Sequence, residues 1–198
     1  MEIWKKDKWE NIQQLKEKLL VFSDNYVIQE IIKQHDVLSR FNNSSVNPVR
    51  IMTLRLNDKI IYLHSTLRFG TPGAITDIRF EGGKEIAHLI KVNPDGTFGT
   101  KVYNADGLSC PIEKYNINQS LVVPNHGKAI EMAIKIHEGL QHFDLVGSDI
   151  TITSDGQPLM IEYNVFWPGI TFPQFCNGPL FGDLTETVIS SVMKKRKK

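Results

Sequence analysis

Residues 147–164 constrain the fold of this chain most, because their pattern predicts a β-hairpin. The two flanking segments, 147–153 and 158–164, alternate between side-chain types as half-buried strands do. Between them lies Asp155-Gly156, a pair that is favoured in two-residue hairpin turns. Counting outward from that turn places Asp149 directly opposite Glu162. The sequence therefore predicts that two acidic side chains face each other across a pair of strands.

The same count predicts the neighbouring pairs and the two faces of the hairpin. It places Thr151 opposite Met160 and Ser154 opposite Gln157. The side chains that we expect to face the core are Ile150, Ile152, Ile161 and Tyr163. An apolar face of this kind specifies the register, because a slip by one residue would turn every apolar side chain to the solvent.

The opposed carboxylates predict a bound cation. Their Cβ atoms would lie roughly 5 Å apart, and like charges at that spacing are destabilising. Asn164 follows Glu162 by two residues, so it lies on the same face and adds a neutral oxygen. Oxygens from Asp, Glu and Asn suit a hard cation such as Mg²⁺. We therefore predict a magnesium site formed by Asp149, Glu162 and Asn164, with a solvated surface hairpin as the alternative.

Length and composition indicate an ordinary globular protein. A chain of 198 residues, 41% hydrophobic and 23% charged, is long enough for one domain. No apolar run approaches the roughly 20 residues of a membrane span, and the N-terminus lacks the apolar core of a signal peptide. Two cysteines form no disulfide framework, so we expect a cytoplasmic location. A net charge of +1 does not indicate nucleic acid, and the basic segment 194–198 is expected to be a solvated tail.

Further strands and helices are expected on both sides of a mostly antiparallel sheet. An amphipathic helix is predicted within residues 1–24, where apolar side chains recur at helical spacing. Hairpins are expected around Asn57-Asp58 and around residues 93–96. The other expected segments are a loop over 70–83, a polar connection to 123, a helix over about 125–143, a loop over 167–182 and a helix over 184–193. This order, without regular strand–helix alternation, predicts an α+β fold.

Arg50 and Arg68 are candidate functional cations. Each lies inside a predicted strand between apolar neighbours, where an arginine is unusual unless it is paired. The planar guanidinium suits a phosphate, because it donates two hydrogen bonds at once. The alternative is a structural ion pair with one of the acids. The glycine-rich loop 70–83 would place backbone amides over a phosphate, but it lacks the pattern of a P-loop.

Two other chemistries are not supported by the sequence. His137 and His142 are five residues apart, so they would lie roughly 140° apart around a helix and could not hold one zinc ion. Cys110, Cys176 and Ser148 lie in no recognisable nucleophile motif, so covalent catalysis by a protein side chain is not predicted.

Six segments follow one another in the order found in a known superfamily. They are residues 26–35, 44–51, 67–70, 82–83, 147–152 and 161–164. The Ser-Ser-Val-Asn run before Arg50 and the Asp149 with Glu162-x-Asn164 combination are the most specific of these. The chain thus resembles the ATP-grasp superfamily from about residue 25 onward, and within it the branch associated with sugar transfer and cell-surface polysaccharide synthesis.

The resemblance implies a nucleotide held between two α+β subdomains. A hinge strand would contact the adenine edge through its backbone, and Glu30 or a following polar side chain such as His35 would lie near the ribose. Arg50 and Arg68 would lie near the phosphates or a substrate carboxylate. The hinge residues implied are Gln29, Glu30, Ile31 and Ile32, and the magnesium ligands implied are Asp149, Glu162 and Asn164.

The resemblance also implies the chemistry. Such enzymes use ATP and Mg²⁺ to activate a carboxylate as an acyl phosphate, which a nucleophile then attacks. The partners would be a nucleotide and a carboxylate or sugar-linked substrate. Two alternatives are a non-catalytic nucleotide-binding or interaction module and a plain structural domain.

Three departures from the family pattern shape our expectations. The family's glycine-rich loop and phosphate-binding lysine precede this region, and nothing before residue 25 supplies them. We therefore expect the chain to be a C-terminal portion, a degenerate relative, or a chain that another polypeptide completes. Ser148 replaces a common tryptophan, and Ile78 follows Asp77 where asparagine is common, so the substrate side is expected to differ.

Overall fold

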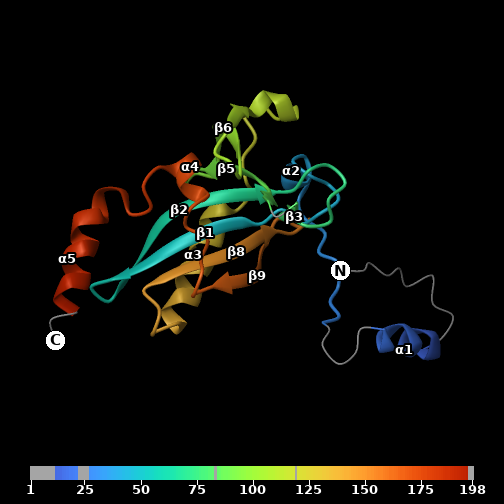
Figure 1. Ribbon diagram of the computed structural model, residues 1–198, viewed down its shortest axis with the longest axis horizontal. Coiled ribbons are helices and arrows are strands. Elements are labelled where there is room, and N and C mark those ends of the chain that lie inside the picture. The colour runs from blue at the N-terminus through green and yellow to red at the C-terminus, as the bar shows by residue number, and fades with distance from the viewer. Residues whose placement is uncertain (1–11, 22–26, 83, 119, 196–198) are drawn as a thin grey trace. The chain divides into compact units, whose positions relative to one another are not determined.

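The computed structural model describes residues 12–21, 27–82, 84–118 and 120–195. The chain divides into two compact units, Met1–Ile31 and Ile32–Lys198. Within the described part of the first unit lies helix α1 (Ile12–Leu20), whose side chains are exposed or half-buried (Figure 1). The helix predicted within residues 1–24 is therefore found over nine of them, and residues 1–11 and 22–24 lie outside the described residues.

The second unit is built on an antiparallel sheet. Among the described residues the sheet has seven strands in the order β7-β6-β5-β2-β1-β8-β9. Their bounds are β1 (Val49–Leu56), β2 (Lys59–Phe69), β5 (His88–Val92), β6 (Phe98–Asn104), β7 (Ser109–Pro111), β8 (Leu145–Ile152) and β9 (Pro158–Asn164). Strands β3 (Arg79–Glu81) and β4 (Lys84–Ile86) form a separate pair.

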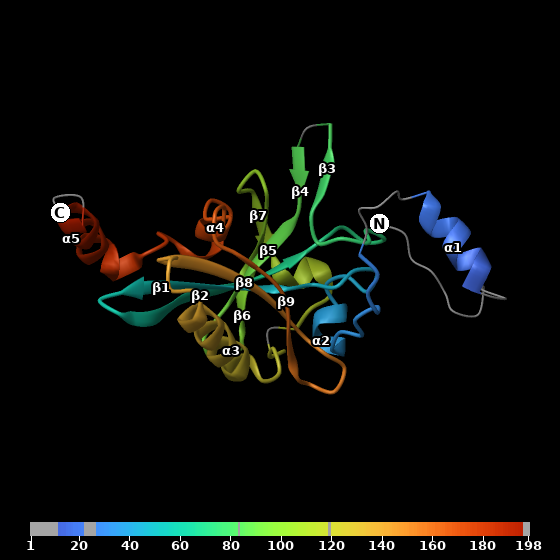
Figure 2. The same cartoon turned by 90° about the horizontal axis from the view of Figure 1, so that it is seen from below.

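Helices cover both faces of the sheet. The α-helices of the second unit are α2 (Asp36–Ser39), α3 (His126–Gly139), α4 (Pro173–Asn177) and α5 (Thr185–Lys195), and the 3-10 helices are η2 (Ile112–Tyr115) and η3 (Gly182–Leu184). Figure 2 shows α2 and α3 on one side of the sheet and α4 on the other. The predicted α+β class with a largely antiparallel sheet is confirmed.

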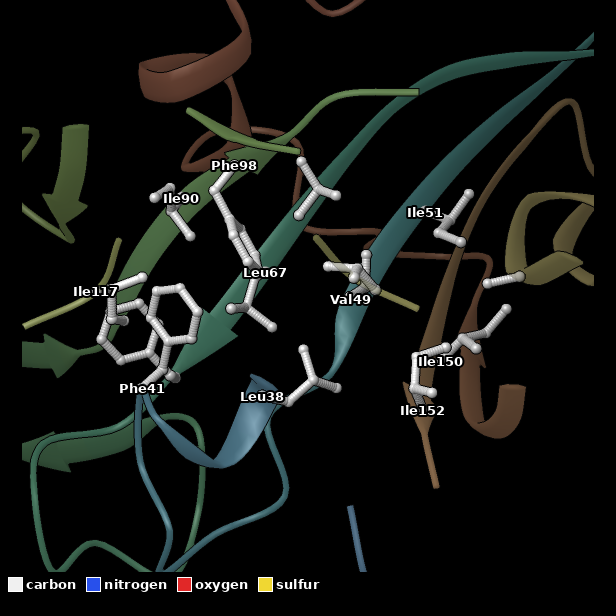
Figure 3. Packing of buried hydrophobic residues seen from close by; sticks show 14 of the residues in the cluster. Leu38, Phe41, Val49, Ile51, Leu67, Ile90, Phe98, Ile117, Ile150 and Ile152 are labelled. Atoms are coloured by element: carbon white, nitrogen blue, oxygen red, sulfur yellow. The ribbon is translucent and has the colours of Figure 1, made fainter. Parts of the chain in front are cut away.

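The core lies between the sheet and the α2–α3 side. Strands β1, β2 and β8 present their alternate apolar side chains to this side, and α3 meets them with Ala129 and Ala133, whose small side chains permit close packing. Figure 3 shows part of this core. Its labelled residues are Leu38, Phe41, Val49, Ile51, Leu67, Ile90, Phe98, Ile117, Ile150 and Ile152.

Local turn chemistry explains the β1–β2 hairpin. Asn57 and Asp58 have φ angles of 50° and 59°. Two successive residues with positive φ make the turn whose twist matches a right-handed strand pair, and Asn and Asp tolerate that conformation. The hairpin predicted around these residues is confirmed.

Three predicted segments differ from the structure. Residues 70–83 are not a loop throughout, because 79–81 pair with 84–86 as β3 and β4. The polar connection to residue 123 contains β7 and η2, and the loop over 167–182 contains α4 and the start of η3. In each case short elements of three to five residues lack a periodic pattern long enough to be recognised in the sequence.

The predicted hinge strand over residues 29–32 is wrong. Residues 27–33 are in no strand, and pairing begins later, where Gln34 bridges Thr153 and the His35 N–H donates to the Ile152 carbonyl at 2.7 Å. A strand needs a partner for its backbone groups, and residues 152–154, at the end of β8, supply that partner only from residue 33 onward. No helix among the described residues is long and apolar enough to cross a membrane.

Candidate functional site

The opposition of Asp149 and Glu162 is confirmed, although the predicted turn is wrong. The Thr153 N–H donates to the Gln157 carbonyl at 2.8 Å, and Gly156 has a φ of 81°. The loop therefore comprises three residues, 154–156, with glycine in the left-handed position that such loops require. Residue pairs next to the loop are shifted by one from the prediction.

A bulge in β9 reverses that shift. Thr151 pairs with Leu159 rather than Met160, and Thr153 rather than Ser154 faces Gln157. Met160 pairs with Ile150, whereas Glu162 pairs with Asp149, so Ile161 is an extra residue. Without this β-bulge, Ile161 would face Asp149, and the Glu162 side chain would point to the other face of the sheet.

The core-facing prediction holds for one strand of this hairpin and fails for the other. Ile150 and Ile152 are fully buried, but Ile161 and Tyr163 are 40% and 45% exposed. The difference arises because β8 is a central strand, whereas β9 is the edge strand of the sheet.

The carboxylate of Asp149 is held by two arginines. Asp149 is buried, and Arg50 is its direct neighbour across the β1–β8 ladder. The Nε and Nη2 atoms of Arg50 donate to Oδ1 and Oδ2 of Asp149 at 2.6 and 2.7 Å. Nη2 of Arg68 donates to Oδ2 at 3.0 Å. Both arginines thus form the ion pair with an acid that the sequence offered as the alternative to a phosphate site.

The two arginines differ in the hydrogen bonds that they still have to offer. Arg50 also donates from Nη1 to the Pro168 carbonyl at 2.6 Å, so each of its three nitrogens has a partner. Nη2 of Arg68 lies 2.8 Å from Oδ2 of Asp77, a charge contact without hydrogen-bond geometry. Nε of Arg68 is buried and has no hydrogen-bond partner among the described residues. Nε of Arg68 therefore has a donor left for a ligand, whereas every nitrogen of Arg50 already donates at least one hydrogen bond.

These contacts keep the buried pair ionised. Burial by itself would raise the pKa of Asp149, but the hydrogen bonds from Arg50 and the charges of Arg68 and Arg50 outweigh it, so the pKa lies below its ordinary value. Burial likewise would lower the pKa of Arg50, but the hydrogen bond and charge of Asp149 outweigh it and the pKa is raised.

Glu162 and Asn164 lie together beside Asp149 and its two arginines. Nδ2 of Asn164 donates to Oε1 of Glu162 at 3.3 Å, and the side chain of Glu162 also interacts with Asp149. The described residues contain no group of three or more His, Cys, Asp or Glu side chains placed to hold a metal ion, and this set has two carboxylates and one amide. Its oxygens fit a cation that keeps several waters, as Mg²⁺ does. Asp149 would contribute only the lone pair of Oδ1 that Arg50 leaves unused.

A family model described as sugar-transfer associated ATP-grasp matches residues 16–188. The chain belongs to the sugar-transfer associated ATP-grasp family. No curated protein matches the chain, and no solved structure does. The match covers the whole seven-stranded sheet and the Asp149–Glu162 hairpin of this ATP-grasp domain. The resemblance predicted from the motifs is confirmed.

The residues expected to contact the nucleotide fall in both units of the chain. Gln29, Glu30 and Ile31 are exposed and belong to the first unit. Ile32 is half-buried in the second unit. His35 is half-buried and caps α2, because its Nδ1 accepts a hydrogen bond from the Val37 N–H at 3.3 Å. Contact of these residues with a nucleotide stays a prediction.

Two groups that contact the arginines of this candidate site have no strong signal in the sequence. Asp77 was noted only as part of a motif, yet it lies against Arg68. Its position within a glycine-rich loop that follows the strand of Arg68 was the available hint. The Pro168 carbonyl, which accepts a hydrogen bond from Arg50, carries no sequence signal, since every residue has a carbonyl group.

Proposed function

We propose that this domain binds ATP with Mg²⁺ and uses it to activate a carboxylate as an acyl phosphate, in a ligase-type reaction of cell-surface polysaccharide synthesis. One observation carries the proposal: the oxygens of Asp149, Glu162 and Asn164 share a sheet face with Arg68, a half-buried guanidinium whose buried Nε has no hydrogen-bond partner among the described residues. Family membership supports the same chemistry.

The residues of the site would have three roles. Glu162 and Asn164, with Oδ1 of Asp149, would hold Mg²⁺, which when bound supplies positive charge to the phosphoryl group under transfer. Arg68 would donate to a phosphate or to the substrate carboxylate, since its planar fork suits both. Arg50 is a positioning residue, because each of its nitrogens already donates a hydrogen bond, and two of these bonds hold Asp149 ionised and in place.

The melting temperature in the presence of Mg²⁺ and ATP tests the nucleotide site. A ligand at 100 times its Kd stabilises a protein by about 2.7 kcal/mol, so Mg²⁺ with ATP should raise the wild-type melting temperature by several degrees. Glu162→Gln should weaken the rise, and Glu162→Gln combined with Asp149→Asn should abolish it. Asp155→Asn, an exposed acid in the same hairpin, is the matched control and should keep the rise. A rise that survives the double substitution would refute the site.

A nucleotide-binding module without turnover is the second candidate. The observation that favours it is that Asp149 already accepts three hydrogen bonds from two arginines, which leaves it little capacity for a cation. ATP consumption in the presence of sugar carboxylates separates the two functions. Consumption that depends on an added carboxylate and is lost in Glu162→Gln supports the ligase. A melting shift without consumption for any carboxylate supports the module.

A further inference from the structure

A second polar cluster lies on the same sheet face as Asp149. Its members are Lys91 of β5, His64 and Thr66 of β2, and Cys176 and Asn177 of α4. Across the sheet Arg50 pairs with Thr66, and Thr66 pairs with Lys91. Because neighbouring strands lie about 4.8 Å apart, the backbone of Lys91 is about 10 Å from that of Arg50. The cluster therefore borders Arg50 at Thr66, and Lys91 lies one strand further along the sheet.

Helix α4 packs over the cluster. Figures 1 and 2 show α4 on this face over β2 and β5, in agreement with its packing against both strands. Nδ2 of Asn177 donates to Oγ1 of Thr66 at 2.7 Å, and Sγ of Cys176 lies 3.9 Å from the same oxygen. Lys91 lies directly opposite Thr66 across the β2–β5 ladder, and its charge acts to lower the pKa of both His64 and Cys176.

Several buried polar atoms of the cluster lack partners. His64 is only 8% exposed, yet neither Nδ1 nor Nε2 has a hydrogen-bond partner among the described residues. Oδ1 of Asn177 is also buried and, within the same described part of the chain, has no partner. Buried polar atoms are normally paired, and exceptions need an explanation such as a bound ligand.

The charge of the cluster is also unbalanced. Lys91 is half-buried and forms no ion pair with any carboxylate in the part of the chain that the structure describes. The acids of this face are engaged elsewhere, since Asp149 and Asp77 contact Arg68. Burial and the charge of Lys91 lower the pKa of His64 to about 4, so the ring is neutral and offers one donor and one acceptor.

We propose that Lys91, His64 and Asn177 form a second binding site, for an oxyanion group (a carboxylate or a phosphate) on a hydroxylated ligand. The ammonium group of Lys91 supplies the charge, and one ring N–H of His64 supplies a further donor. The other ring nitrogen and Oδ1 of Asn177 accept hydrogen bonds from hydroxyl groups. The inference goes beyond the proposed function, because it requires neither ATP nor a metal ion.

Ring ¹⁵N resonances of His64 in the full-length protein test the site. The titrants are inorganic phosphate, D-glucuronate and D-glucose, each at constant ionic strength and without ATP or Mg²⁺, and His64→Gln assigns the signal. We expect a saturable shift with at least one of the two anions. A shift with phosphate alone identifies a phosphate group, a shift with glucuronate alone identifies a sugar carboxylate, and a shift with both identifies any oxyanion.

Three variants separate the site from general anion effects. Lys91→Met should weaken the binding at least tenfold, and Asn177→Asp should weaken it as well, because it adds a negative charge at nearly the same volume. Lys101→Met, at an exposed lysine of β6, should leave the titration unchanged. The proposal is overturned by the absence of a saturable shift with either anion, by an equal shift with glucose, or by a shift that persists in Lys91→Met.

Discussion

At the residue scale, Arg50 and Asp149 depend on each other. Each is almost fully buried, and each stays charged because the other is within hydrogen-bond distance. A buried ion pair of this kind contributes little net stability over an apolar pair of similar size, but removal of one partner leaves a buried charge. The main role of the pair is therefore to fix the position of the Asp149 carboxylate.

The substitution Arg50→Met should destabilise the protein by about 3 kcal/mol, because Asp149 keeps only Arg68 as a partner. The double substitution Arg50→Met with Asp149→Leu should cost less than the single one, since the buried Asp149 carboxylate is removed and Arg68 keeps its contact with Asp77. Urea denaturation measures both, and Lys101→Met at an exposed lysine should stay within about 0.5 kcal/mol of wild type. A double variant less stable than Arg50→Met would contradict this account.

Residue type predicted part of this cluster. An arginine between apolar neighbours in a strand indicates a paired cation, and both Arg50 and Arg68 are paired. Their shared partner could not be named, because Asp149 is 99 residues from Arg50 in the chain. Nor did the sequence show that every nitrogen of Arg50 donates a hydrogen bond while Nε of Arg68 does not.

At the element scale, the β8–β9 hairpin was predicted correctly through two errors that cancel. The three-residue loop shifts the pairing by one position, and the bulge at Ile161 shifts it back before Asp149. Asp-Gly is compatible with both loop lengths, and Ile161 has no local feature that marks a bulge. Bulges are frequent at sheet edges and beside functional sites, and this one turns Glu162 toward Asp149.

The loop geometry makes Gly156 sensitive to substitution. Its φ of 81° lies in the left-handed region, so Gly156→Ala should destabilise the protein by about 1–2 kcal/mol although there is space for the added methyl group. Gly127 lies in α3 with nothing near the position of a Cβ, so Gly127→Ala should stabilise by about 0.5 kcal/mol. Urea unfolding of the two variants checks both signs. Equal effects would show that φ is not the cause.

At the scale of the whole molecule, buried histidines link stability to pH. Burial lowers the pKa of His64, His88, His126 and His137. The unfolded chain therefore takes up protons below pH 6.5, the ordinary value, while the folded chain does not. Stability is then lost as the pH falls from about 6.5, because protonation favours the unfolded state. Asp149, whose pKa is lowered from 3.8, adds a further loss at more acidic pH.

The free energy of unfolding should fall steadily from pH 7 to pH 4. His64 alone should contribute about 3 kcal/mol to the loss, since one pH unit corresponds to about 1.4 kcal/mol and its pKa moves from 6.5 to about 4. The slope in His64→Gln should be shallower than in wild type. An unchanged slope in His64→Gln would show that His64 is protonated in the folded protein.

The sequence by itself determined the α+β class, the β1–β2 hairpin, the opposition of Asp149 and Glu162, and the motifs of the ATP-grasp family. These depend on periodicity and turn chemistry, which act over a few residues. Only the tertiary structure decided that β1 lies between β2 and β8, and hence that Arg50 and Arg68 converge on Asp149. It also decided that α4, which contains Asn177, packs against β2 and β5, the strands of His64 and Lys91. The order of strands in a sheet, and the faces that helices cover, depend on apolar residues that are far apart in the chain and are buried against each other. No local sequence pattern encodes that arrangement.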